Sequence, residues 1–166
     1  VMITGDRRET AVAIAKDAGL LQRPNELVWT SAELAEMSDE QVKLELHKLR
    51  VVARALPMDK SRLVRLAQEM NLVVGMTGDG VNDSPALKKA DVGFAMGSGT
   101  EVAKEAGDIV ILDDNFLSIK QAILYGRTIY NSGSTWSWIL WRHWPSAVSQ
   151  RWKNTCVKSQ KTAAHR

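Results

Sequence analysis

Short apolar runs that end in glycine or aspartate and lead into a helical pattern constrain the fold of this chain more than any other feature. Examples are the run at 51–53, before a helical pattern that Pro57 opens, and the run at 72–76, before Thr-Gly-Asp-Gly at 77–80. Each run has the length of a buried strand, and a helix between two strands allows them to pair in parallel. The sequence therefore predicts an α/β fold with a mainly parallel sheet and helices on both faces.

The expected elements alternate along residues 1–131. Strands are predicted at 1–3, 27–29, 51–53, 72–76, 92–96 and 109–112. Helices are predicted at 9–18, 39–49, 57–70, 82–90, 101–106 and 116–130. Ser31 and Ser38 are both predicted N-caps, and Gln41 completes a capping-box pattern with Ser38.

The basic charge of the chain is concentrated at its C-terminal end. The 166 residues carry a net charge of +3, from 22 Lys and Arg against 19 Asp and Glu. All 19 acids lie in residues 1–131, whereas residues 132–166 hold six basic residues and five of the six tryptophans. Because no basic stripe runs through residues 1–131, we expect no nucleic-acid partner.

The change in composition predicts a boundary between two parts, 1–131 and 132–166. The single cysteine, Cys156, lies in the second part and permits no intramolecular disulfide. We expect residues 132–166 to be a disordered or non-native tail, and their aromatic and basic mixture leaves binding at a membrane interface as an alternative. No apolar run reaches the roughly 20 residues that a membrane-spanning helix needs, so no transmembrane segment is expected in this chain.

The sequence Met-Thr-Gly-Asp-Gly-Val-Asn-Asp-Ser-Pro-Ala-Leu at 76–87 carries the strongest chemical signal. Asp79 directly follows a predicted strand, and Asn82 and Asp83 come within one turn of it. Carboxylate and amide oxygens at the carboxyl edge of a parallel sheet suit Mg²⁺. The pattern predicts a Mg²⁺ site at Asp79, and the alternative is an acidic loop that only caps a helix.

Two further segments offer groups that bind phosphate. Thr-Gly-Asp at 4–6 follows a predicted strand, where a hydroxyl and free backbone N–H groups can hold a phosphoryl oxygen. Lys60 lies in the first turn after Pro57, and its ammonium is suited to a transferring phosphoryl group. Taken alone, the first segment is also a common turn and the second a solvated lysine.

The sequences at 76–97, 99–106 and 113–116 resemble the phosphorylation domain of P-type cation-transporting ATPases, in particular the calcium-pump branch. The resemblance extends over residues 1–131. It implies a haloacid-dehalogenase-like three-layer fold with a mainly parallel sheet. In this family an aspartate accepts the γ-phosphoryl group of ATP, and hydrolysis of the aspartyl phosphate is coupled to the movement of a cation through membrane helices.

The resemblance also assigns roles in phosphate binding. Thr4 and Gly5 match the residues that hold the phosphoryl group, and Asp6 matches their acidic partner. Lys60 matches the lysine that neutralises the transferring phosphoryl group. Arg54 matches a basic residue near the bound nucleotide, so ATP is the implied substrate of the parent enzyme.

The remaining matches concern the metal. Asp79 matches the carboxylate that binds Mg²⁺, the implied cofactor. Asn82 and Asp83 match the pair that orders the phosphate and Mg²⁺ site. These roles agree with phosphoryl transfer in general, where positioning and charge neutralisation supply most of the catalysis.

The family's nucleophile lies in an Asp-Lys-Thr-Gly-Thr sequence that these 166 residues do not contain. Met-Asp-Lys-Ser at 58–61 is no substitute, because no Gly-Thr follows it and it opens a helix. The family's nucleotide-binding domain, actuator loop and membrane helices are also missing, and a strand-like run begins at Val1 without an initiating methionine. We therefore expect a fragment whose sheet is incomplete at the nucleophile strand, and which is inactive alone.

The leading functional hypothesis is thus a fragment of a P-type ATPase that couples ATP hydrolysis to transport of a cation, calcium by resemblance. The parent protein would place it at the cytoplasmic face of a membrane. The alternative is a non-catalytic regulatory or membrane-binding module that acts through the basic, Trp-rich tail. A small phosphatase is disfavoured, because no Asp-x-Asp or Asp-x-Thr sequence is present.

Overall fold

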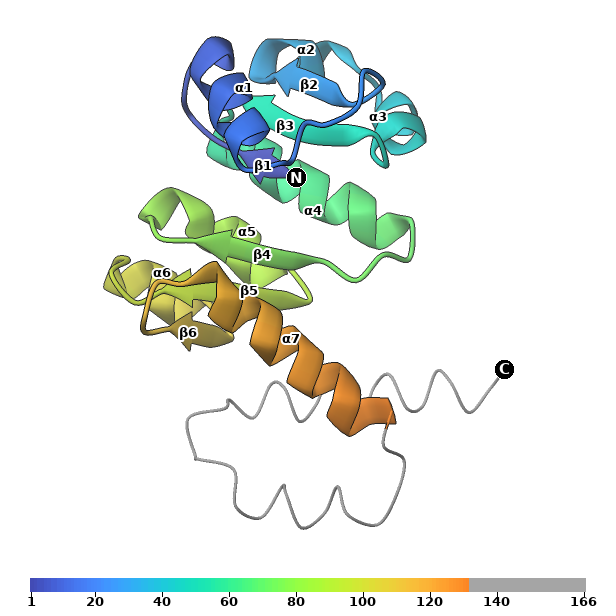
Figure 1. Cartoon of the computed structure of the whole chain (residues 1–166). Helices are drawn as coiled ribbons and strands as arrows, with labels where there is room; N and C mark the ends of the chain where they lie inside the picture. The colour runs from blue at the N-terminus through green and yellow to red at the C-terminus, as the bar shows by residue number, and fades with distance from the viewer. Residues whose placement is uncertain (132–166) are drawn as a thin grey trace. The chain divides into compact units, whose positions relative to one another are not determined.

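The computed structural model describes residues 1–131, and the predicted tail lies outside them (Figure 1). Contacts divide the chain into two compact units, Val1–Val74 and Gly75–Arg166. Strands and helices alternate as predicted, and every strand pairing is parallel. The strands form two three-stranded sheets, one in each unit, where the sequence predicted a single sheet.

Unit 1 is a parallel sheet with helices on both faces (Figure 1). Its strands are β1 (Met2–Ile3), β2 (Leu27–Thr30) and β3 (Leu49–Ala53), in the order β1-β3-β2. Its helices are α1 (Arg8–Asp17), α2 (Ser31–Glu36), α3 (Asp39–Glu45) and α4 (Pro57–Glu69).

The central strand β3 is buried on both sides. Val51 and Ala53 pack with two alanines of α1, Ala11 and Ala15. Val52 belongs to a second cluster that includes Trp29 of β2 and buried residues of the other three helices, namely Leu34, Val42, Leu63 and Leu66. Burial on two faces explains why residues 51–53 of β3 are consecutively apolar and not alternating.

Unit 2 also contains a parallel three-stranded sheet. Its strands are β4 (Gly75–Gly78), β5 (Val92–Met96) and β6 (Ile109–Ile111), in the order β4-β5-β6. Its helical segments are η1 (Val81–Asp83), α5 (Ser84–Lys89), α6 (Glu101–Ala106) and α7 (Phe116–Asn131). Phe94 of β5, Ile111 of β6 and Ile119 of α7 form one apolar cluster. Gly93 allows close packing, because a Cβ there would lie 2.8 Å from the carbonyl oxygen of Leu87.

The predicted strand at 72–76 is wrong in position. Leu72 and Val73 are 51% and 85% exposed, and β4 begins only at Gly75. Asn71 has a φ of +59°, and its left-handed backbone lies just beyond the end of α4. The apolar residues that follow belong to the connection, and the strand itself is Gly-Met-Thr-Gly, with only Met76 buried.

One of the two predicted N-caps is confirmed and the other is wrong. Ser38 caps α3 and forms the capping box with Gln41, as predicted. Ser31 does not cap α2, because Thr30 accepts the capping hydrogen bond from the backbone N–H of Glu33. The Ser31 hydroxyl instead donates to Asp59 at 2.6 Å. The helix predicted at 39–49 ends at Glu45, and β3 begins at Leu49.

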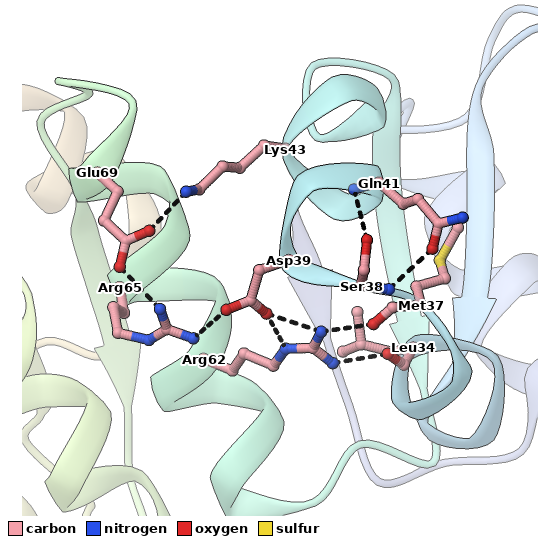
Figure 2. Close-up of polar contacts among 9 residues, drawn as sticks. All are labelled: Leu34, Met37, Ser38, Asp39, Gln41, Lys43, Arg62, Arg65 and Glu69. Carbon is pink, nitrogen blue, oxygen red and sulfur yellow. Dashed lines mark hydrogen bonds and ion pairs between the residues drawn. The ribbon is translucent and has the colours of Figure 1, made fainter.

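A network of ion pairs joins α3 to α4 (Figure 2). Asp39, at the start of α3, accepts hydrogen bonds from Arg62 Nε at 2.9 Å and Arg65 Nη2 at 2.7 Å. Arg62 also donates to the backbone carbonyls of Leu34 and Met37, both at 2.7 Å. The network therefore satisfies carbonyl groups at the end of α2 and fixes three helices together.

The substitution Asp39→Asn should make unit 1 less stable at neutral pH and remove part of its acid sensitivity. The Arg65 and Arg62 guanidinium groups hold the pKa of Asp39 below its usual value. The stabilisation is therefore present above the unfolded pKa of about 3.9 and is lost as the pH falls through the lower folded pKa. Urea unfolding midpoints between pH 2 and 8 measure this effect.

The matched control is Asp17→Asn, since Asp17 pairs with no cation among the described residues. We expect the difference between wild type and Asp39→Asn to be largest near pH 7 and to shrink below pH 4, roughly the unfolded pKa of aspartate. A difference that stays constant from pH 7 to pH 2 would show that the ion pairs do not stabilise the unit.

Candidate functional site

The Thr-Gly-Asp sequence at 4–6 forms a tight turn at the carboxyl end of β1. The Thr4 hydroxyl donates to Asp6 Oδ2 at 2.8 Å, and the backbone N–H of Asp6 donates back to Thr4 Oγ1 at 3.2 Å. Gly5 and Asp6 are exposed, and a Cβ at Gly5 would meet nothing within 4 Å. The turn is therefore closed by its own side chains and leaves room for an exogenous group at Gly5.

Backbone hydrogen bonds bring Arg54 to this turn. The N–H of Arg54 donates to the carbonyl of Asp6, and the N–H of Ala55 donates to the carbonyl of Thr4, both at 2.9 Å. Arg54 has a φ of +51°, a conformation that costs an arginine roughly 1–2 kcal/mol. Strain of this kind concentrates at functional sites, and sequence reasoning could not detect it because it is a property of the backbone.

Lys60 lies half-buried in the first turn of α4, and its neighbour Asp59 is buried. Asp59 Oδ2 accepts hydrogen bonds from the backbone N–H of Leu56 at 2.8 Å and from the Ser31 hydroxyl at 2.6 Å. These bonds fix the start of α4 and link it to α2. Asp59 therefore has a structural role, which agrees with the interpretation that Met-Asp-Lys-Ser at 58–61 is not the nucleophile sequence.

In unit 2, a loop that starts with Asp79 follows β4 directly. Asp83 is buried, and its Oδ2 accepts hydrogen bonds from the backbone N–H groups of Asp79 at 3.3 Å and Gly80 at 3.4 Å. The carbonyl of Asp79 accepts from the backbone N–H of Thr100 at 2.8 Å. The backbone of Asp79 is thus held from two sides, while Asp79 itself is exposed.

Glycine is required beside this loop. A Cβ at Gly78 would lie 2.4 Å from the Cβ of Asp83, and one at Gly99 would lie 2.8 Å from the carbonyl oxygen of Asp79. Both contacts are far closer than van der Waals distance. The two glycines therefore permit the close approach that holds the Asp79 loop together.

The Asp79 loop has a donor set that fits a hydrated Mg²⁺ ion. Asp79 and Asn82 are both exposed and supply a carboxylate and an amide oxygen. Mg²⁺ commonly keeps several waters and binds through one or two carboxylates together with substrate phosphates. Within residues 1–131 there is no group of three or more His, Cys, Asp or Glu side chains placed to hold a metal.

The structure divides the candidate residues between the two units. Unit 1 holds Thr4, Gly5, Asp6, Arg54 and Lys60, and its turn follows the edge strand β1. Unit 2 holds Asp79, Asn82 and Asp83, and its loop follows the edge strand β4.

Three residues of unit 2 have roles that sequence reasoning missed. Thr100 fixes the Asp79 backbone and caps α6. Asp114 adopts a φ of +50° and accepts a hydrogen bond from the backbone N–H of Ser98 at 3.1 Å. Ser84 has a buried hydroxyl that finds no hydrogen-bond partner within residues 1–131. Only the Thr100 cap has a sequence signal, a threonine directly before a helical pattern.

In both units, parallel strands alternate with helices, which is the arrangement of an α/β protein. Loops that carry an aspartate follow two of these strands, β1 and β4. Residues 62–123 match the family of haloacid dehalogenase-like hydrolases. The match includes β4, β5, β6 and the Asp79 loop. The fold is therefore haloacid dehalogenase-like, as the resemblance implied.

Comparison with individual proteins shows which members of this class the chain is similar to. The chain is 48% identical over 132 residues to calcium-transporting ATPase 1 of Lactococcus lactis, and 49% identical over 133 residues to the calcium-transporting ATPase of Bacillus subtilis. It is 51% identical over 129 residues to calcium-transporting ATPase 2 of Schizosaccharomyces pombe. Over about four-fifths of its length this chain is homologous to the calcium-transporting branch of the P-type ATPases.

The chain spans only a small part of these relatives. The matches cover 80%, 80% and 77% of this chain, but 15%, 15% and 10% of the bacterial and yeast proteins in the same order. Among solved structures, the catalytic domain of the CPx-ATPase CopB-B is 27% identical, with a TM-score of 0.44, over 70% of this chain and 44% of that one.

The two aspartates of the unit 2 loop should respond differently to substitution. Asp83→Ala removes a buried acceptor of two backbone N–H groups, so we expect it to lower the free energy of unfolding of unit 2 by roughly 1–3 kcal/mol. Asp79→Ala removes an exposed side chain, so we expect it to change the free energy of unfolding of unit 2 by no more than about 0.5 kcal/mol. Urea unfolding of the full chain measures both, and equal losses would contradict the assignment of separate roles.

Proposed function

We propose that this chain supplies the phosphate- and Mg²⁺-binding part of the phosphorylation domain of a P-type ATPase that transports calcium. The observation that carries the proposal is the 48% and 49% identity to calcium-transporting ATPases over about four-fifths of this chain. Each loop follows the carboxyl end of a parallel strand, where open α/β sheets bind their ligands.

In unit 1 the proposed role is to hold and neutralise phosphoryl groups. The Thr4 hydroxyl and the backbone N–H of Gly5 would donate to phosphoryl oxygens, and Asp6 keeps the turn closed through Thr4. Lys60 would place a positive charge against the transferring group, where it stabilises developing negative charge. Arg54 would contact the nucleotide phosphates of bound ATP, since its backbone is fixed beside the turn.

In unit 2 the proposed role is to hold Mg²⁺. When bound, Mg²⁺ supplies positive charge to the phosphoryl oxygens. Asp79 and Asn82 would provide protein oxygens for it. Asp83 would act as a positioning residue, because its carboxylate is committed to the backbone of Asp79 and Gly80.

The reaction needs a carboxylate nucleophile that these 166 residues do not contain, because no Asp-Lys-Thr-Gly-Thr sequence is present. In the proposed step this aspartate attacks the γ-phosphorus of ATP, ADP leaves, and water later hydrolyses the aspartyl phosphate. The isolated chain would therefore be inactive.

The cation and the membrane belong to the whole protein. In residues 1–131 no helix combines the length and hydropathy that crossing a membrane requires. We propose a position at the cytoplasmic face of a membrane, with ATP and calcium as ligands of the complete transporter. The support is the set of calcium-transporting relatives, one of which is described as plasma membrane-type.

Titration of the full chain with Mg²⁺ tests the metal site. We expect amide chemical shifts of residues 79–83 to move with Mg²⁺, and Asp79→Asn to weaken the apparent affinity at least about tenfold, because one carboxylate contributes much of the attraction for a hydrated divalent ion. Glu105→Gln is the control, an exposed acid on α6. An Asp79→Asn titration that matches wild type would contradict the proposal.

A chimera tests the catalytic role. Residues 1–131 would replace the matching segment of the Bacillus subtilis calcium-transporting ATPase, which is 49% identical to this chain over 133 residues. We expect the chimera to hydrolyse ATP in a calcium-dependent manner, and Lys60→Ala or Asp79→Asn to reduce turnover at least about 100-fold, since each removes charge stabilisation of the transferring group.

Lys16→Ala is the control, an exposed lysine in the last turn of α1. The 166-residue chain alone should release no phosphate from ATP. Turnover by the isolated chain that Asp79→Ala abolishes would refute the proposed inactivity. A chimera in which Lys60→Ala keeps full activity would refute the phosphoryl role of Lys60.

A further inference from the structure

Unit 1 carries a basic pocket at the amino ends of β2 and β3. The pocket is formed by the two segments that precede these strands and by the start of β3, and its lining residues are Arg23, Asn25, Glu26, His47, Lys48 and Arg50. The two segments meet because β2 and β3 are parallel. The backbone N–H of Leu27 joins them by donating to the carbonyl of Lys48 at 2.9 Å.

The pocket is separate from the residues assigned to phosphate above. Thr4 follows the carboxyl end of β1, and Arg54 follows the carboxyl end of β3. Because all three strands of the unit 1 sheet are parallel, the amino and carboxyl ends lie at opposite edges of this sheet. A ligand in the basic pocket would therefore leave the Thr4 turn open.

Glu26 is the one acid among the lining residues, and it is committed to its neighbours. Its Oε2 accepts from the backbone N–H groups of Gln22 at 2.7 Å and Arg23 at 3.0 Å, and its Oε1 accepts from Arg50 Nε at 3.2 Å. The N–H groups of Arg23 and Gln22 hold the pKa of Glu26 below its usual value, so the carboxylate stays ionised and paired. The Glu26 side chain is only 10% exposed, which leaves the accessible charge to the basic residues.

The basic residues leave two positive charges uncompensated. Arg50 offsets Glu26, whereas Arg23 and Lys48 pair with no acid within residues 1–131. Arg50 Nη1 donates to the carbonyls of His47 at 2.9 Å and Leu49 at 3.1 Å. These bonds use Nε and Nη1, so the N–H groups of Arg50 Nη2 can donate to a bound anion.

The charge and the size of the pocket indicate its ligand. A guanidinium group matches the oxygen geometry of a phosphate group, and a lysine ammonium adds a compact charge. The volume of the pocket is ≈ 160 Å³, the space of about five water molecules at roughly 30 Å³ each, whereas sites for drug-sized ligands begin at about 300 Å³. We propose that this pocket binds the doubly charged phosphate group of a small soluble molecule, held by Arg23, Lys48 and Arg50.

Inorganic phosphate and glycerol phosphate are the two probes, each titrated into the full chain at constant ionic strength. The pH is about 8, well above the second pKa of about 6 of a phosphate ester, so the phosphate group carries two charges. We expect saturable shifts of the amide resonances of residues 23–26 and 47–50. The urea midpoint of unit 1 should rise with either probe, because the ligand binds the folded state alone.

The double variant Arg23→Gln with Lys48→Gln should weaken the apparent affinity at least about tenfold, because it removes both uncompensated charges. Neither side chain makes a hydrogen bond or ion pair among the residues that the structure describes, so the variant should fold as wild type does. The matched control is Lys16→Gln with Lys120→Gln, which changes net charge equally at exposed positions outside the pocket. Its affinity should stay within about twofold of wild type.

The two probes distinguish the sources of the phosphate group. Binding of both supports recognition of the phosphate group itself, and binding of glycerol phosphate alone supports a phosphate ester as the ligand. Pocket resonances that move with neither probe, or that move equally in wild type and in the Arg23→Gln, Lys48→Gln variant, would overturn the proposal. The Thr4 turn reports through its own resonances at residues 4–6, so this proposal and the proposed function can fail independently.

Discussion

Parallel strand pairing is the constraint on which the rest of the structure depends. Because β1 and β3 run in the same direction, the turn at Thr4 and the residue Arg54 meet at one end of the sheet and are joined by backbone hydrogen bonds. The same rule places the Asp79 loop at the carboxyl end of β4, beside residues that follow β5. Parallel strands also require helices between them, which explains why both faces of β3 are buried.

Burial distinguishes four of the aspartates in and near the candidate loops. Asp59 and Asp83 are buried, and each accepts hydrogen bonds from backbone N–H groups at the start of a helical segment. Asp6 and Asp79 are exposed at strand ends. A buried carboxylate that accepts from the backbone fixes a loop. The exposed Asp6 also helps to close its turn, through the hydrogen bond from Thr4.

Much of the fold could be predicted from the sequence, because short-range patterns determine it. The α/β alternation and the capping box of Ser38 with Gln41 both follow from residues close in sequence. The boundary of β4 could not be predicted, since Leu72 and Val73 are apolar but exposed and the left-handed turn at Asn71 has no strong signal. The role of Ser31 depends on Asp59, 28 residues away, and long-range contacts of this kind do not appear in a local pattern. For the same reason the motifs identified Asp79 and Asp83 as candidates, but not the backbone N–H groups of Asp79 and Gly80 that Asp83 accepts from.

The central proposal is that the Asp79 loop of unit 2 holds Mg²⁺. The most direct measurement replaces Mg²⁺ with paramagnetic Mn²⁺ and records amide broadening in the full chain with inorganic phosphate present. If the loop holds the ion, broadening should be strongest at Asp79 and Asn82, and Asp79→Asn should remove it. Broadening at the loop that Asp79→Asn leaves unchanged would contradict the proposal.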